Sequence, residues 1–186
     1  MLKKIVIGCG VVGAALAGYI ATRPSEFRVV RSRTLAASPD VVHAYVNDFH
    51  TWSRWSPWET VDPAMERKLS GAPAGPGAVY AWRGNRQIGE GRMIITDSQP
   101  ARSVTIRLEF LKPLRATHTA QFEFVPSGVG TSVTWSMSGE NGFVGKAISM
   151  VMDMDAMIGS NFERGLASLD AVTAGEAAGR TGGNRS

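Results

Sequence analysis

Cysteine is nearly absent from this sequence, because Cys9 is the single one among 186 residues. No disulfide can form within the chain, and a zinc site built on several cysteines is excluded. Histidine is also scarce. His43, His50 and His118 form neither an HExxH arrangement nor another metal-ligand spacing. We therefore expect no metal site and no cofactor.

Charged residues are few, at 19% of the chain, and the net charge of +4 is not gathered into any run of lysine and arginine. Nucleic-acid binding needs a dense basic surface, so nucleic acid is not an expected partner. No GxSxG element surrounds Ser56, which leaves a serine hydrolase unsupported. Asp153 and Asp155 point in different directions on a helix, which predicts a solvated face and a cap partner and not a catalytic pair.

Residues 5–22 contain no charge at all, with Lys3 and Lys4 before them and Arg23 after them. As a helix they would span about 27 Å, close to the roughly 30 Å of a bilayer core. We predict a single-pass membrane anchor in residues 1–25. The two lysines favour a domain on the non-cytoplasmic side, although the basic residues that follow weaken this choice. A cleaved signal peptide is the alternative, because small residues lie near Ala21.

The same segment contains Gly8-x-Gly10-x-x-Gly13, the spacing of a dinucleotide-binding loop. Its context does not fit that function. The acidic residue needed about twenty positions later is missing, since Val30 and Arg31 stand there. The chain also does not continue as alternating strands and helices. This interpretation is therefore the weaker one.

From residue 27 onward the sequence predicts an antiparallel sheet with one covered face. Apolar and polar residues alternate most clearly in 103–110 and 114–124. Gly89 and Gly91 suit a bulge or bend in a curved sheet. The expected strands cover 27–35, 64–69, 78–83, 87–96, 103–110, 114–124 and 131–137, with short helices over 38–46 and 48–55.

A long final helix is predicted over residues 142–172, because its apolar residues recur at steps of three, four and seven. The apolar face comprises Ile148, Val151, Met152, Ile158, Phe162, Leu166, Leu169 and Val172. Residues 174–186 are small and polar and predict a disordered tail. The folded domain is thus expected over 26–173.

The order of elements and several motifs are similar to those of the START-like, or SRPBCC, superfamily, in the branch labelled polyketide cyclase/dehydrase-like. The motifs are Val46-Asn47-Asp48-Phe49, Trp52-x-x-Trp55-Ser56-Pro57-Trp58-Glu59, Gly77-Ala78-Val79-Tyr80-x-Trp82-x-Gly84-Asn85, Gly89-x-Gly91-x-Met93, Gly130-Thr131-x-Val133-x-Trp135 and Met154-Asp155-x-Met157-x-Gly159-x-x-Phe162-Glu163. This resemblance implies an α+β helix-grip fold, a curved antiparallel sheet wrapped around the C-terminal helix. It also implies a cavity between them that holds an apolar small molecule or lipid.

The candidate ligand-binding residues are the aromatic, methionine and histidine side chains expected to face that cavity. They are Trp52, Trp55, Trp58, Tyr80, Trp82, Met93, Phe110, His118, Phe122, Trp135, Met137, Met150, Met154 and Met157. The three clustered tryptophans could close the cavity mouth or plug one end of the core. His118, on the apolar face of its strand, is the candidate catalytic residue, although a hydrogen-bonded core histidine is the alternative.

Three functions remain open at this stage. The first is a membrane-tethered module that binds a hydrophobic small molecule or lipid. The second is a cyclase or dehydratase that uses the same cavity, and it ranks lower because no acid–base pair at a defined spacing is present. The third is an interaction domain whose cavity is filled by side chains.

Overall fold

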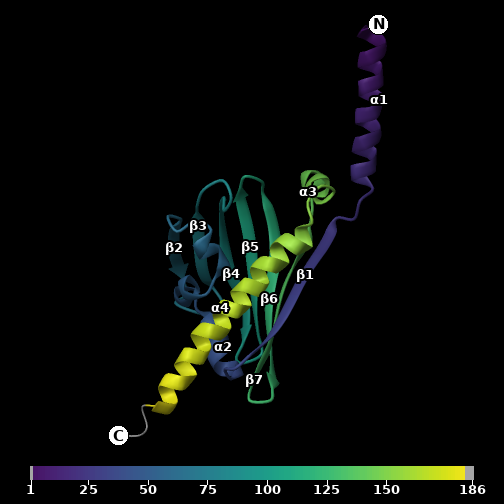
Figure 1. Ribbon diagram of the computed structural model, residues 1–186. Coiled ribbons are helices and arrows are strands. Elements are labelled where there is room, and N and C mark those ends of the chain that lie inside the picture. The colour runs from purple at the N-terminus through teal and green to yellow at the C-terminus, as the bar shows by residue number, and fades with distance from the viewer. Residues whose placement is uncertain (1, 183–186) are drawn as a thin grey trace.

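One antiparallel sheet forms the centre of the molecule, with helices before and after it (Figure 1). The computed structural model describes residues 2–182, and side chains within 10–175. The elements are α1 (Leu2–Ala21), β1 (Glu26–Leu35), α2 (Pro39–Asn47), the 3-10 helices η1 (Phe49–Arg54) and η2 (Pro57–Thr60), β2 (Glu66–Gly71), β3 (Ala78–Arg83), β4 (Glu90–Gln99), β5 (Ser103–Lys112), β6 (Ala116–Ser127), β7 (Gly130–Glu140), α3 (Phe143–Ser149) and α4 (Met154–Gly182).

The seven strands lie in the order β1-β7-β6-β5-β4-β3-β2, so the chain meanders from β2 to β7 and then pairs with β1. Every neighbouring pair is antiparallel. The α+β class, the antiparallel sheet and the C-terminal helix were predicted from the sequence and are confirmed. The bulge expected near Gly89 and Gly91 is also present, because the register between β4 and β5 shifts between Glu90 and Gly91.

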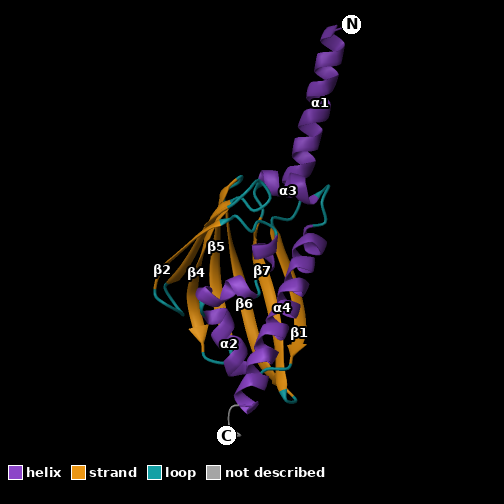
Figure 2. Ribbon diagram, turned by 60° about the vertical axis from the view of Figure 1, so that its left-hand side comes forward, coloured by secondary structure: helices purple, strands orange, loops and turns teal. Residues whose placement is uncertain are grey.

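One face of the sheet carries the core, and α2 and α4 lie against it (Figure 2). Alternate residues of the central strands point to this inner face, which explains why Val104, Ile106 and Phe122 are fully buried. From the helix side, α4 contributes Phe162 and Leu166, each 1% exposed. The core therefore forms where the first half of α4 crosses the sheet.

The predicted final helix is interrupted, contrary to the single element expected over 142–172. Residues 150–153 separate α3 from α4, and the backbone N–H of Ala156 donates to Asp153 Oδ1 at 2.9 Å. An aspartate in this position caps a helix start, so α4 begins anew after it. As a consequence Val151 and Met152, expected on the buried face, are exposed. At its other end α4 runs on to Gly182, past the point where a disordered tail was expected.

Arg31 of β1 holds the first turns of α4 against the sheet. Its Nε donates to Glu163 at 2.8 Å and its Nη2 to Asp155 at 2.9 Å. Gly159 lies between these two acids, and a Cβ there would overlap the guanidinium. The absence of a side chain at 159 thus lets the arginine lie flat along the helix.

The N-terminal segment forms α1, which extends away from the sheet next to α3 (Figure 1). The helix predicted over residues 5–22 therefore exists, but the prediction that it spans a membrane is not supported. Within the described residues, no helix combines the length and the apolar character that crossing a bilayer requires.

Candidate functional site

The inner face of the sheet has a closed end packed with aromatic rings. Trp135 stacks between Phe122, at 4.6 Å between ring centroids, and Phe162, at 4.1 Å. Trp55 contacts both Phe122 and Trp135, and Trp52 packs against Trp55 at 4.7 Å. Because Trp52 and Trp55 are each 2% exposed, these predicted site residues lie inside the core at this end.

The opposite end of the same face is only half covered. Six side chains gather there, and we refer to them as the His118 cluster: Phe27, Trp82, Met93, Leu108, Phe110 and His118. Strand register places them side by side on the inner face, since Trp82 pairs with Gly91, Gly91 with Phe110, and Leu108 with both Met93 and His118. Apart from Trp82, which is buried, these residues remain half-buried and reachable by solvent. This half-covered apolar surface is the candidate site.

His118 is the polar group of this cluster. Its register partners are Leu108 on one side and Gly139 on the other. The ring of Phe27 meets the imidazole edge-on at 4.9 Å, and Phe110 lies at 5.7 Å. The Nδ1 atom is buried, yet it has no hydrogen-bond partner among the described residues. A buried polar atom without a partner costs about 1–3 kcal/mol, so a polar group that reached this atom would recover that cost. In the closed end, the indole Nε1 atoms of Trp55 and Trp135 also lack a partner among the described residues.

Two glycines, Gly139 and Gly91, allow the rings of His118 and Trp82 to pack close to the neighbouring strands. A Cβ at residue 139 would overlap Nδ1 of His118. A Cβ at residue 91 would lie 2.5 Å from Cζ2 of Trp82 and 2.5 Å from the carbonyl oxygen of Glu109. His118 and Trp82 therefore lie directly against the backbone of neighbouring strands, which keeps the surface above them open.

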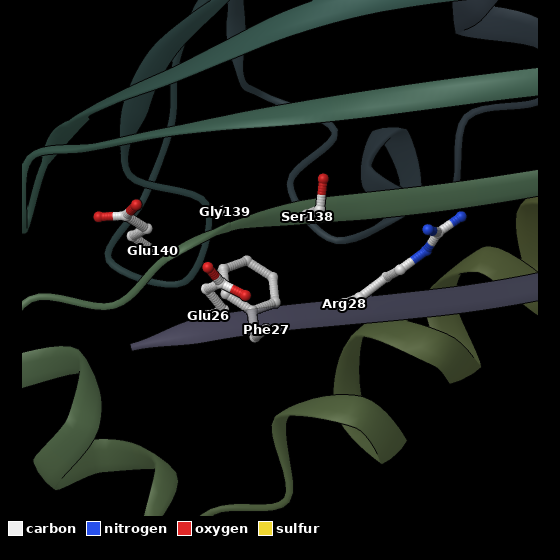
Figure 3. A pocket seen from close by; sticks show the side chains of 6 residues that line it. All are labelled: Glu26, Phe27, Arg28, Ser138, Gly139 and Glu140. Carbon is white, nitrogen blue, oxygen red and sulfur yellow. The ribbon is translucent and has the colours of Figure 1, made fainter. Parts of the chain in front are cut away.

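A pocket of about 470 Å³ adjoins the cluster where β1 begins and β7 ends (Figure 3). It is lined by Glu26, Phe27, Arg28, Ser138, Gly139 and Glu140. Phe27 and Gly139, which line it, are also the neighbours of His118. A second pocket, of about 260 Å³, lies between η1 and the β2–β3 hairpin and is separate from His118. His118 does not line the first pocket. Four of the pocket's lining residues alternate with the inward-facing Phe27 and Gly139 and so belong to the outer face of the sheet: Glu26, Arg28, Ser138 and Glu140.

Burial lowers the pKa of His118, and the backbone of Thr117 acts in the opposite direction to a smaller extent. Burial likewise lowers the pKa of His43, whose Nε2 lies 2.9 Å from the Ser98 hydroxyl. Both imidazoles are therefore neutral at pH 7 in the folded domain. A neutral imidazole has one donor and one acceptor nitrogen, so His118 can meet either kind of polar group.

We expect the domain to lose stability between about pH 7 and about pH 5. In the unfolded chain each histidine has a pKa of about 6.5, whereas burial holds the pKa of His118 and His43 lower in the fold. The contribution of each neutral imidazole is complete above about pH 6.5 and is lost as the pH falls through the folded value. Urea unfolding at both pH values, on wild type and His118→Gln, measures this. A variant with the same pH dependence as wild type would contradict it.

Tyr80 belongs to a separate polar group at the β2–β3 edge of the sheet. Its hydroxyl donates to Glu59 Oε1 at 2.7 Å, and Arg67 forms an ion pair with the other oxygen of the same carboxylate. Burial and the bond to Glu59 raise the pKa of Tyr80, so its hydroxyl stays protonated. These contacts attach η2, which carries Glu59, to the sheet.

The remaining predicted site residues do not all join the cluster. Met137 is buried below it on β7, and Met154 is half-buried on α4. Met150 and Met157 are exposed, and Trp58 packs edge-on against Trp135 in the closed end. Four further residues contribute to the site and were not predicted from the sequence: Phe27, Leu108, Gly91 and Gly139. The signal for Phe27 was its position two residues before the buried Val29 on the same strand face.

Comparison with known families gives one match over residues 26–174, to the family described as polyketide cyclase / dehydrase and lipid transport. The chain belongs to this family. The matched region begins at β1 and includes the whole sheet and the buried half of α4. No match was found among curated proteins.

Solved structures share the fold at low sequence identity. Protein CV1439 from Chromobacterium violaceum is 12% identical, with a TM-score of 0.58 over 78% of this chain and 96% of that one. Ara h 8.0201 is 10% identical, with a TM-score of 0.56 over 81% and 99%. The di-domain ARO/CYC StfQ from the steffimycin biosynthetic pathway is 13% identical, with a TM-score of 0.60, over 83% of this chain and 52% of that one. These likenesses show that the chain shares its fold with these structures.

Proposed function

We propose that this protein binds a hydrophobic small molecule or lipid against the His118 cluster, with a polar group of the ligand paired to His118. The observation that carries the proposal is the buried, unpartnered Nδ1 atom on an otherwise apolar surface. An apolar body would cover Phe27, Leu108 and Phe110, which are half-buried in the free protein. The description of the family, which includes lipid transport, supports this class of ligand.

The packing of the inner face favours this end over the closed one. Trp55, Trp135 and Phe162 already fill the space under the first half of α4, so a ligand there would have to displace buried aromatic rings. Displacing well-packed rings forfeits their contacts and their buried area. At the His118 cluster, a ligand gains apolar contact without that loss.

We expect His118→Gln to fold normally and to bind the fluorescent apolar probe ANS roughly tenfold more weakly, the size of one hydrogen bond. The measurement is a fluorescence titration beside thermal melting. His43→Gln is the matched control, because His43 is also half-buried but bonds to Ser98 on another part of the domain. Val151→Ser controls for probe bound to apolar surface outside the cluster.

Each result of this experiment has a defined meaning. Weaker ANS binding in His118→Gln, with both controls unchanged, supports the proposal. Equal binding by wild type and His118→Gln would remove His118 from the ligand site. A fall in melting temperature without a change in probe affinity would show a purely structural histidine.

A cyclase or dehydratase is the second candidate, and the same atom favours it. A neutral imidazole with an unpartnered nitrogen can accept a proton from a bound substrate. The positions around it are occupied by Phe27, Leu108, Phe110 and Gly139, which carry no acid or base to assist. Binding therefore comes first. Catalysis would be indicated by a loss of about a hundredfold or more in turnover of a poly-β-ketone substrate by His118→Gln while its binding persists.

A further inference from the structure

An exposed apolar surface lies at the end of the molecule where α3 follows the sheet. Its residues come from α3 and from the break before α4: Phe143, Val144, Met150, Val151 and Met152, with Val151 83% exposed. Of these, Val151 and Met152 were expected on the buried face of the final helix, and Met150 was expected to line the cavity. A contiguous group of large apolar side chains in solvent marks an interaction surface more often than chance exposure does.

The N-terminal helix extends this surface. Ile20 of α1 is buried at the junction, where α1 packs against α3, and Lys146 Nζ donates to the carbonyl oxygen of Ala21 at 3.2 Å. Beyond the junction Val12, Leu16 and Tyr19 of α1 are exposed. Figures 1 and 2 show both helices at the same end of the molecule, with α1 directed away from the sheet.

The charges of these two segments have one sign. Residues 1–25 contain Lys3, Lys4 and Arg23, and residues 142–152 contain Lys146, with no aspartate or glutamate in either range. The guanidinium of Arg23 lies over the Tyr19 ring at 5.2 Å, beside the exposed apolar side chains. Apolar side chains flanked by basic groups match the interface of a membrane that carries anionic lipids. Charge complementarity therefore favours an anionic surface over a neutral or basic one, and the exposed apolar side chains beside the basic groups favour lipid as that surface.

We propose that α1, α3 and residues 150–152 together dock this protein on the surface of an anionic lipid bilayer. The apolar side chains enter the region between headgroups and acyl chains, and the basic residues meet the phosphates. This inference goes beyond ligand binding at His118 and does not depend on it. Docking of this kind does not require α1 to cross the membrane.

The test is cosedimentation of the full chain with vesicles of mixed phosphatidylcholine and phosphatidylglycerol, and with vesicles of phosphatidylcholine alone. We expect the double variant Val151→Ser/Met152→Ser to bind the mixed vesicles roughly tenfold more weakly than wild type. We also expect added salt to weaken binding to the mixed vesicles. Val129→Ser is the matched control, because Val129 is 99% exposed at the β6–β7 turn, outside the proposed surface.

Three results would overturn this proposal. Wild type that binds neither kind of vesicle has no lipid-docking surface. Equal binding by wild type and the double variant would assign any membrane contact to α1 and remove α3 from it. An oligomer in the absence of lipid, dissociated by the double variant, would show that a second copy of the chain covers the surface. In each case His118→Gln can still be judged by ANS binding, so the two proposals fail separately.

Discussion

Phe162→Ala is expected to destabilise the domain by about 3–5 kcal/mol. The ring is 1% exposed and stacks on Trp135 with 8° between the two planes. Removing it leaves a cavity where α4 meets the sheet, and the surrounding aromatic rings cannot collapse into it fully. Urea unfolding followed by tryptophan fluorescence measures the loss, because Trp55 and Trp135 lie in this core.

Phe143→Ala is the matched control for this prediction. It removes the same ring from α3, where Phe143 is 51% exposed. Its effect should stay within about 0.5 kcal/mol, as for other surface substitutions. If both variants had the same urea midpoint of unfolding as wild type, Phe162 would not be what holds α4 against the sheet.

Gly91→Ala is expected to destabilise the domain by about 1–3 kcal/mol and to weaken ANS binding. The added methyl would lie 2.5 Å from the Glu109 carbonyl oxygen and 2.5 Å from the Trp82 ring. The carbonyl belongs to β5 and cannot move without separating the strands, so relief requires Trp82 to tilt into the His118 cluster. Stability and probe binding should therefore change together, as measured by urea unfolding and fluorescence titration.

Gly175→Ala provides the comparison, because a Cβ on this α4 residue meets nothing within 4 Å. Alanine favours a helix over glycine by up to about 1 kcal/mol, so this variant should be neutral or slightly stabilised. Wild-type stability in Gly91→Ala would mean that β4 and β5 can separate at the bulge without cost.

The strands were predictable because side-chain alternation is a local property of the chain. Val104 and Ile106 alternate with polar residues in the sequence and are fully buried in the structure. The final helix shows the limit of such a pattern. Apolar spacing was right at Phe162 but wrong at Val151, since spacing identifies apolar positions and does not show whether the helix is continuous. The capping potential of Asp153 was the local signal for the break.

The site could be predicted only in part, for a different reason. Alternation along β6 assigned His118 to the inner face, where it lies. The spacing of Trp52 and Trp55 could not distinguish a lid from a core plug, because both need an apolar ring on one side of a short helix. Phe27 and Gly139 were missed because their proximity to His118 depends on the pairing of β1, β7 and β6, which join distant parts of the chain.

The pairing of β1 with β7 also determines when this domain can fold. Arg31 on β1 bonds to Glu163, 132 residues later in the chain. During synthesis β1 therefore emerges first and has no partner strand until β7 follows. Its unpaired backbone edge is open to other nascent chains in that interval. Such non-local closure slows folding, and β1 joins the sheet only after β7 has formed.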